Sequence, residues 1–400
     1  MKSYTFSGKK VLRERVLYFC SSMNAAGIYI HIPFCRSRCS YCDFATGLYE
    51  SSLAEQYVRA LVSEIESWNE IETPGAVDTI YFGGGTPSLL SAEQLQTILD
   101  AVHARFRVVP GSEITLEMNP GTVTREALRE FRSLGVNRAS FGAQTFDDKE
   151  LARLGRSHST SETIQTFEWL REAGFENVSL DLIAGLPGQS IAAWQRNLER
   201  SLALNPEHLS FYLLEVHEGT PLAEHIRTGK QPRPDADLAA QMYQLMLESA
   251  CAAGYEHYEI SNLCRRGWES RHNTKYWDGT AYYGFGCSAH SYDGADQRWA
   301  NQRSVLGYIE AIEQGVDVIV ERTALTPDEI RAEAAFLGLR LMRGLNTKQY
   351  QNHFGVDLLT EHQEELKQFH EAGLLEFDGD VLRLTRSGAL LSNEVFSAFV

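Results

Sequence analysis

The feature that most constrains the fold is an alternation of short apolar runs and amphipathic helical segments between residues 28 and 235. The runs return roughly every 30 to 40 residues, the spacing of βα units in a parallel sheet. The six runs are IYIHI (28–32), VDTIYF (77–82), EITLEM (113–118), RASFGA (138–143), NVSLDLI (177–183) and HLSFYLLEV (208–216). Six units are fewer than the eight of a closed barrel. The sequence therefore predicts an α/β fold, an incomplete (β/α)6 TIM-like barrel over residues 27–235 with a lateral opening.

The segments between the runs predict helices with defined beginnings. Ser52 with Glu55, and Ser91 with Gln94, have the spacing of a capping box ahead of an apolar helical pattern. The pattern ends at GKQPRPDAD (229–237), a polar segment with two prolines that we interpret as a boundary. We expect residues 236–325 to contain a linker and a segment described below.

The two ends of the chain differ from the barrel in composition. The first 22 residues hold five basic residues and one acid, so we expect residues 1–26 to be a weakly structured extension. Met23 is a possible alternative start, and a transit-type targeting segment is the competing interpretation. Residues 326–400 predict helices followed by a hairpin around Asp378-Gly379, a mainly helical winged-helix-like domain. Its 12 acidic and 7 basic residues favour scaffolding or substrate covering over DNA binding.

Charge and hydropathy limit the partners of the chain. With 53 acidic and 37 basic residues the net charge is −16, which repels phosphate backbones, so we expect no nucleic-acid partner. No stretch approaches the ~20 consecutive apolar residues of a membrane helix. We therefore expect a cytoplasmic protein that is not integral to a membrane.

Three cysteines lie within eight positions directly after the first run. Cys35, Cys39 and Cys42 have the spacing C-x3-C-x2-C, and an odd total of 7 cysteines argues against a disulfide framework. Three thiolates can bind three corners of a four-iron cluster and leave the fourth iron open. A structural zinc site is the alternative, with a fourth ligand from Cys251, Cys264 or Cys287.

The loop CRSRCSYC resembles the signature of the radical S-adenosylmethionine (SAM) family. The resemblance implies a [4Fe-4S] cluster whose open iron binds the amino and carboxylate groups of SAM. It also implies that the reduced cluster cleaves SAM to a 5′-deoxyadenosyl radical, so that the cofactor carries the difficult chemistry. No catalytic side chain is predicted beyond the groups that bind these cofactors.

Polar or glycine-rich sequence follows each of the first five runs, at the end of barrel strands where functional groups collect. Each has a plainer interpretation: a tight turn for GGGTP, a helix-capping acid for Glu117, and a structural arginine partner for Asp181. Together they match the SAM-contacting residues of the coproporphyrinogen III oxidase-like subfamily. The implied SAM-binding residues are Tyr29, Tyr41, Gly84, Gly85, Thr86, Glu117, Gln144, Arg156 and Asp181.

Two features place the chain within that subfamily. The oxygen-independent coproporphyrinogen III oxidase has a further cysteine two residues after the third, where this chain has Phe44. The segment HNTKYW (272–277) matches an H-N-x-x-Y-W motif that is tied to heme binding in the heme chaperone branch. In isolation such a segment is more often a packed loop, but the resemblance makes His272 the candidate axial heme ligand, with Cys287 as a competing thiolate.

The resemblance implies a heme-binding radical SAM protein that delivers heme to acceptor hemoproteins, membrane-bound respiratory enzymes among them. It also implies a low-potential electron donor such as flavodoxin. Coproporphyrinogen III oxidation or radical modification of heme is the alternative. A metal-stabilised interaction protein without catalysis is a third hypothesis.

Overall fold

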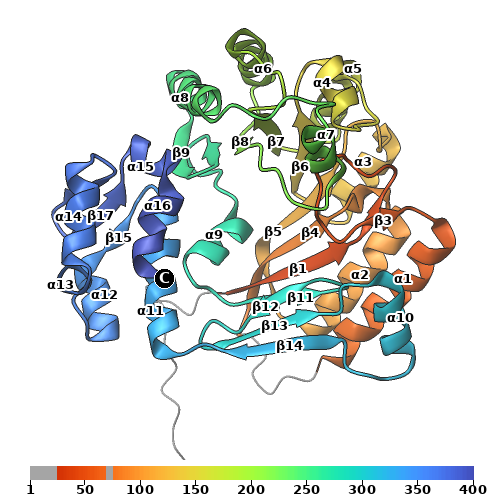
Figure 1. Ribbon diagram of the computed structural model, residues 1–400. Coiled ribbons are helices and arrows are strands. Elements are labelled where there is room, and N and C mark those ends of the chain that lie inside the picture. Colours follow the sequence, from red (N-terminus) through yellow and green to blue (C-terminus); the bar gives the residue numbers. More distant parts are fainter. Residues whose placement is uncertain (1–24, 69–74) are drawn as a thin grey trace, which may run out of the picture.

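The computed structural model describes residues 25–68 and 75–400, and its centre is one twelve-stranded mixed sheet (Figure 1). Most of the expected extension over residues 1–26, with the alternative start at Met23, lies outside the described residues. Six neighbouring strands are parallel and follow one another in chain order. They are β1 (Ala26–Ile32), β4 (Val77–Gly84), β5 (Val108–Met118), β6 (Arg138–Gln144), β7 (Asn177–Ala184) and β8 (His208–Leu213). The predicted open α/β barrel is confirmed.

Helices connect these strands, as expected for βα units. They are α1 (Ser51–Ser67), η1 (Pro87–Leu89), α2 (Ala92–Arg105), α3 (Arg125–Ser133), α4 (Asp148–Arg153), α5 (Thr160–Glu172) and α6 (Ile191–Ala203). Ser91 and Gln94 form the predicted capping box of α2. The box predicted for Ser52 and Glu55 is wrong, because Ser52 already lies inside α1 and its hydroxyl donates to Glu50 at 2.9 Å.

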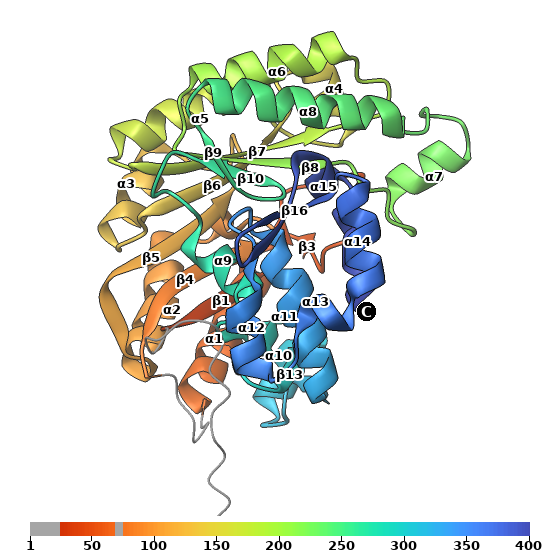
Figure 2. The same ribbon diagram turned by 90° about the vertical axis from the view of Figure 1, so that its left-hand side faces the viewer.

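One apolar core joins the strands to the helices. Ile28, Ile30 and Phe82 are fully buried on the sheet and belong to the same cluster as Leu61 of α1 and Leu95 of α2. Burying each such side chain contributes about 1.5–3 kcal/mol. After β8 the chain forms α7 (Pro221–Arg227) and α8 (Ala236–Ala252), which lies beside α6 (Figure 2).

Residues 236–325, which were expected to contain a linker, extend both edges of the parallel sheet. On the β8 side, β10 (Asn262–Cys264) and β9 (Glu256–Glu259) add as antiparallel strands. On the other side, β11 (Tyr282–Phe285) runs parallel to β1. It is followed outward by β12 (His290–Tyr292), β13 (Gln297–Asn301) and β14 (Ile319–Ala324), with α10 (Val305–Glu313) between the last two. The edge of β1 is therefore covered by strands from much later in the chain.

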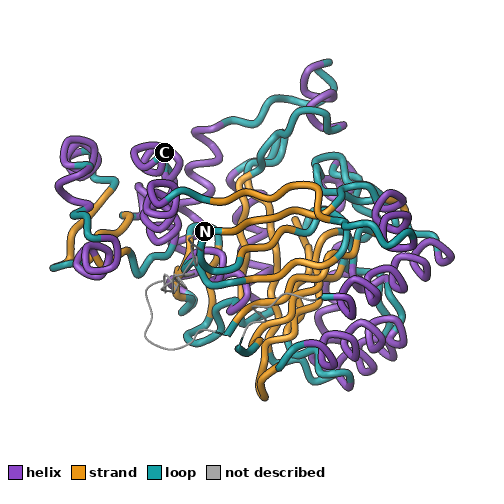
Figure 3. The backbone as a smooth tube through the Cα atoms, turned by 90° about the horizontal axis from the view of Figure 1, so that it is seen from below, coloured by secondary structure: helices purple, strands orange, loops and turns teal. Residues whose placement is uncertain are grey.

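The C-terminal domain has its own apolar cluster and its own small sheet, in the order β15-β17-β16. In Figure 3 its helices form a separate group beside the strands of the large sheet. Its elements are α11 (Pro327–Arg340), β15 (Leu345–Asn346), α12 (Thr347–Phe354), α13 (Leu358–Glu361), α14 (Gln363–Glu371), β16 (Leu375–Asp378), β17 (Val381–Leu384), α15 (Arg386–Leu390), α16 (Ser392–Phe396) and η2 (Ser397–Phe399). The mainly helical, winged-helix-like architecture is confirmed. No helix within the described ranges is both long and apolar enough to cross a membrane.

Candidate functional site

A cavity of about 460 Å³ opens at the carboxyl ends of the parallel strands, and we call it the strand-end cavity. Most of the predicted site residues line it, although they come from five different strands and the loops that follow them. They are Cys35, Cys39, Tyr41, Cys42, Gly84, Gly85, Glu117, Gln144, Arg156 and Asp181. The fold therefore brings together nearly all the positions that the strand-end motifs predicted.

The three cysteines lie on a loop that is anchored to the barrel by its backbone. Cys35 ends the short strand β2 (Phe34–Cys35), which pairs with β3 (Gly47–Leu48), and the amide of Ser40 donates to the carbonyl of Leu154 at 2.9 Å. Burial raises the pKa of the Cys35 and Cys42 thiols, and the neighbouring thiol of Cys39 adds to the effect. A bound metal offsets this cost, because it stabilises the thiolate form directly.

The other cysteines among the described residues lie away from this loop, and Cys20 is outside the described ranges. Cys264 is buried in β10, Cys287 is buried after β11, and Cys251 is on α8. None of them is among the described residues that line the strand-end cavity. Within residues 25–68 and 75–400, three thiols line the cavity without a fourth, which fits a cluster with an open corner better than a zinc site closed by four thiolates.

The glycines of GGGTP let β4 approach the cysteine loop. A Cβ atom on Gly85 would lie 2.6 Å from the carbonyl oxygen of Phe34, and one on Gly84 would lie 2.6 Å from the ring of His31. The amides of Gly85 and Thr86 donate to Ile32 and Phe34 at 2.8 and 2.7 Å. Gly84 also has a φ of 109°, which favours glycine. The glycines are therefore required by packing, and two of them form part of the cavity wall.

Arg156 connects the cysteine loop to the strand ends. Its guanidinium donates to Cys39 Sγ at 3.5 Å, to the carbonyl oxygen of Gly142 at 2.8 Å and to the side-chain oxygen of Asn119. Asn119 in turn donates to Thr86 Oγ1 at 2.7 Å, and Thr86 donates to Cys35 Sγ at 3.6 Å. Thr86 is thus one layer behind the cavity wall and is 1% exposed.

Two carboxylates point into the cavity from the ends of β5 and β7. Glu117 accepts hydrogen bonds from the hydroxyl of Tyr81 at 2.7 Å and from the amide of Gly84 at 3.2 Å. Burial raises the pKa of Glu117 to about 7 and that of Asp181 to about 6. The Oδ1 atom of Asp181 is buried and has no hydrogen-bond partner among the described residues. An unpaired acceptor in a cavity wall is costly unless a ligand donates to it.

Gln144 has backbone angles that are uncommon for its residue type. Its φ is 64°, in the left-handed region, and the residue sits at the end of β6. Strained positions of this kind cluster at functional sites. Gly142 accommodates the turn, because a Cβ atom there would collide with the side-chain amide of Gln144.

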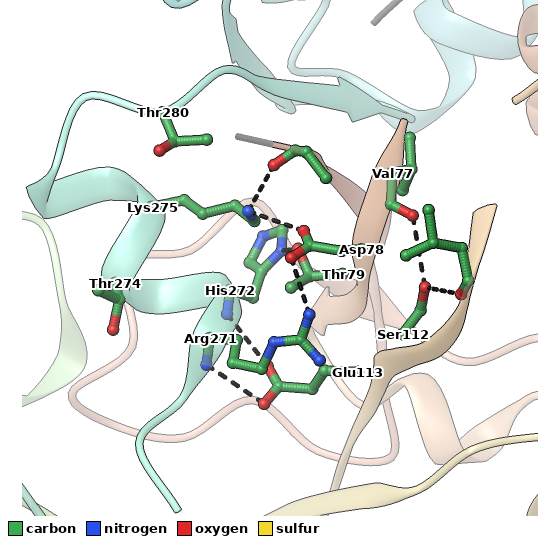
Figure 4. Close-up of polar contacts among 12 residues, drawn as sticks. Val77, Asp78, Thr79, Ser112, Glu113, Arg271, His272, Thr274, Lys275 and Thr280 are labelled. Carbon is green, nitrogen blue, oxygen red and sulfur yellow. Dashed lines mark hydrogen bonds and ion pairs between the residues drawn. The ribbon is translucent and has the colours of Figure 1, made fainter. Parts of the chain in front are cut away.

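Helix α9 (Arg271–Trp277), which carries HNTKYW, lies at the opposite, amino-terminal end of the barrel (Figure 4). The amides of Arg271 and His272 donate to the carboxylate of Glu113 at 3.2 and 3.0 Å. A carboxylate at a helix amino terminus is stabilising. The side chains of Arg271 and Lys275 both pair with Asp78 at 2.8 Å. These contacts fix α9 against the beginning of β4 and the middle of β5.

His272 is 1% exposed and both of its ring nitrogens already have partners. Nδ1 is 2.8 Å from Thr79 Oγ1 and Nε2 is 2.9 Å from the hydroxyl of Tyr276. Burial lowers the pKa of His272 to about 3, so the ring is neutral. In this arrangement His272 offers no free nitrogen to an iron atom.

Tyr29 lies between the two ends of the barrel and not in the cavity wall. Its ring stacks on Tyr81 and on His272, with ring centres 6.2 and 6.4 Å apart, and its hydroxyl is 3.1 Å from His31 Nδ1. Sequence reasoning missed Asn119 and Tyr212, which also line the cavity. Asn119 could have been found, because it follows Glu117 in the same strand-end motif, whereas Tyr212 carries no such signal.

Comparisons with known proteins agree with this geometry. Residues 29–200 match the Radical SAM superfamily and residues 325–391 match the HemN C-terminal domain. The heme chaperone HemW of Bacillus subtilis is 38% identical over 93% of this chain and 98% of that protein. The mitochondrial radical S-adenosyl methionine domain-containing protein 1 of Bos taurus is 35% identical over 91% of this chain and 84% of that protein.

A solved structure supports the fold over the whole length. Coproporphyrinogen III oxidase (HemN) from Escherichia coli superposes with a TM-score of 0.82, covering 98% of this chain and 93% of that chain, at 23% identity. At this identity the likeness speaks for the fold alone. The sequence relatives, which span nearly the full chain, identify it as a member of the HemW family of radical SAM proteins.

Proposed function

We propose that this protein is a cytoplasmic heme chaperone that holds a [4Fe-4S] cluster and SAM in the strand-end cavity, binds heme and delivers it to hemoproteins. The observation that supports this most is the convergence of three thiols, one arginine and two half-buried carboxylates on one cavity. This convergence occurs in a chain that resembles the heme chaperone HemW over almost its entire length.

The cysteine loop is the proposed cluster site. Cys35, Cys39 and Cys42 would each hold one iron and leave the fourth iron to the amino and carboxylate groups of SAM. When bound and reduced, the cluster supplies the electron that cleaves the sulfonium bond of SAM. The role of Arg156 is to offset the negative charge of the thiolates, since its guanidinium already lies 3.5 Å from Cys39.

The strand ends are the proposed nucleotide site. Glu117 and Asp181 would accept hydrogen bonds from the hydroxyl groups of SAM, because both carboxyl groups belong to residues that line the cavity. Gly84 and Gly85 allow the ligand to approach the backbone closely. Tyr41 and Gln144 complete the wall. Tyr29 and Thr86 would act behind it, by holding Tyr81 and Cys35 in place.

The heme chaperone is favoured over coproporphyrinogen III oxidase by one residue in the cavity wall. Phe44 is 63% exposed and lines the strand-end cavity where the oxidase carries a further cysteine. Radical modification of heme is the other alternative. The proposed partners are acceptor hemoproteins, membrane-bound respiratory enzymes among them, and a low-potential electron donor such as flavodoxin.

Anaerobic reconstitution tests the cofactors first. We expect about four irons per chain, and 5′-deoxyadenosine after addition of SAM and dithionite. A protein that takes up zinc, holds no cluster and cleaves no SAM would contradict the proposal.

Heme transfer tests the chaperone directly. Hemin should bind to the purified protein and give a Soret band, and the loaded protein should restore activity to a heme-free acceptor. Turnover of coproporphyrinogen III to protoporphyrinogen IX under the same conditions would instead assign the oxidase.

A further inference from the structure

A second cavity lies at the other end of the molecule, and the function proposed above does not yet use it. It has a volume of about 520 Å³ and lies between α9 and the sheet edge on one side and α11 with β15 on the other; we call it the interdomain cavity. Its size is within the range of small-molecule sites, which favour clefts between domains. Tyr276 and Trp277, the last two residues of HNTKYW, form part of its wall.

Aromatic rings make up one side of the interdomain cavity. The rings of Tyr276 and Tyr282 meet edge to face, with centres 4.6 Å apart, and Trp277 packs against Tyr276 at 6.2 Å. The guanidinium of Arg340 lies 4.2 Å from the ring centre of Trp277 and fixes it from behind. The opposite side is apolar and comes from α11, with Ala334 and Leu337. Such a pair of walls suits a flat apolar ring system.

One charged residue of the wall can meet an acidic group of a ligand. The indole Nε1 of Trp277 and Nε of Arg298 have no hydrogen-bond partner among the described residues, but both atoms are buried behind the wall. Arg298 also lines the cavity, where its two terminal nitrogens hold Glu333 at 2.8 and 2.6 Å. Arg343 lines the cavity as well and is exposed. Guanidinium groups recognise carboxylates with high geometric specificity.

We infer that the interdomain cavity binds the porphyrin ring of heme, with the macrocycle between the aromatic wall and α11 and a carboxylate at the exposed Arg343. The inference rests on the proposed function and gives the heme a site separate from SAM. It also gives HNTKYW a physical role that differs from direct ligation. His272 holds the hydroxyl of Tyr276 at 2.9 Å and so fixes the wall, while the porphyrin contacts Tyr276 and Trp277.

The lining of the interdomain cavity suits a protein that binds heme and then releases it to another protein. In the described part of the chain, no histidine, cysteine or methionine lines it. Three tyrosines do, and the hydroxyls of Tyr276 and Tyr292 are already 2.9 Å from His272 Nε2 and from the carbonyl oxygen of Ala295. The strong imidazole, thiolate and thioether bonds to iron are therefore left to the acceptor. A protein that ligated the iron itself would have to break those bonds at each delivery.

Equilibrium titration of the full chain with hemin tests the site. Leu337→Trp places a large ring inside the cavity, so we expect hemin to bind at least about tenfold more weakly. Leu306→Trp, the same change at a residue of α10 that is 60% exposed, should bind hemin like the unchanged protein. Circular dichroism of each variant checks that the fold is retained.

A charge reversal provides the second variant, in case Leu337→Trp fails to fold. Arg343→Glu should weaken hemin binding about tenfold, whereas Arg129→Glu on the exposed surface of α3 should not. Affinities of Leu337→Trp and Arg343→Glu equal to that of the unchanged protein would overturn the inference and leave the proposed function standing. Absence of saturable hemin binding by the unchanged protein would instead overturn the proposed function.

Discussion

The strand-end cavity and the interdomain cavity are similar in volume, about 460 and 520 Å³, but they are built in different ways. The first is formed by the carboxyl ends of successive strands, each of which contributes a polar group next to the cysteine loop. The second is formed between two domains, by residues from 276 to 381 that share no repeating pattern. Each strand of the barrel therefore fixes the position of the motif at its own end. The interdomain cavity depends instead on how the C-terminal domain packs against the sheet.

The two cavities also differ in charge. Carboxylates with raised pKa values and three thiols dominate the strand-end cavity, where a ligand must bring positive charge or hydrogen-bond donors. The other is lined by aromatic rings, two arginines and two carboxylates, so its charges balance and it suits a flat, largely apolar ligand. The comparison predicts that the two sites can be disabled one at a time.

Removal of a cysteine should have the largest effect and should affect only one cavity. Cys39→Ala leaves two thiols, so we expect almost complete loss of bound iron and of 5′-deoxyadenosine formation, because a cluster corner is lost. Hemin binding should persist, since the interdomain cavity is untouched. The control is Cys251→Ala on α8, which should behave like the unchanged protein in iron analysis. Simultaneous loss of hemin binding in Cys39→Ala would contradict the separation of the two sites.

Neutralisation of Glu117 is expected to have the next largest effect, a loss of affinity for SAM. Glu117→Gln keeps the shape of the side chain but removes an acceptor charge, so SAM should bind roughly 10- to 100-fold more weakly. Isothermal titration of the cluster-loaded protein measures this change. Glu93→Gln, at an exposed position of α2, is the matched control. Unchanged affinity in Glu117→Gln would show that the ligand does not contact this carboxylate.

A pH experiment tests the burial of His272 on α9. The pKa of His272 is lowered to about 3 by burial, against an ordinary value of 6.5. Between these values the unfolded chain binds a proton that the folded chain does not, so stability falls as pH drops below 6.5. The loss amounts to about 1.4 kcal/mol per pH unit. The free energy of unfolding, measured with urea, should fall more between pH 7.5 and pH 5.5 for the unchanged protein than for His272→Gln. An equal fall in both proteins would place the His272 ring in a more open environment.

The smallest expected effect concerns the absorption spectrum of the heme. His272→Gln should weaken hemin binding by disturbing Tyr276, but the Soret maximum of the bound form should stay where it is, because no axial bond is removed. A shifted maximum in this variant, absent from Thr274→Ser on the same helix, would identify His272 as the axial ligand that the sequence first suggested.

The barrel and its cavity were predictable from the sequence because local signals and the global fold agree there. The apolar runs predicted the strands, and the resemblance to the radical SAM family named the residues that follow them, ten of which line the cavity. His272 shows the limit of this reasoning. The motif singled out the histidine, but only the packing of α9 on Thr79 and Glu113 reveals that both ring nitrogens are in use.

The segment after residue 236 was harder to predict for a physical reason. Between residues 236 and 325 its strands are only three to six residues long, and each becomes a strand by pairing with an edge that the sequence does not identify. β11 is a strand because it pairs with β1, which precedes it by about 250 residues. No local pattern in the sequence therefore predicts it. Short strands at sheet edges and cavities between domains share this dependence on distant partners.

The pairing of β1 with β11 has a consequence for synthesis on the ribosome. The first strand of the barrel emerges early, yet one of its two neighbours, starting at Tyr282, is translated only after most of the chain. Until then the nascent protein presents an apolar strand, with Ile28 and Ile30, whose backbone groups are open to wrong partners. Truncated chains that stop before residue 282 should consequently yield insoluble product, and an excised N-terminal half is a poor choice for expression.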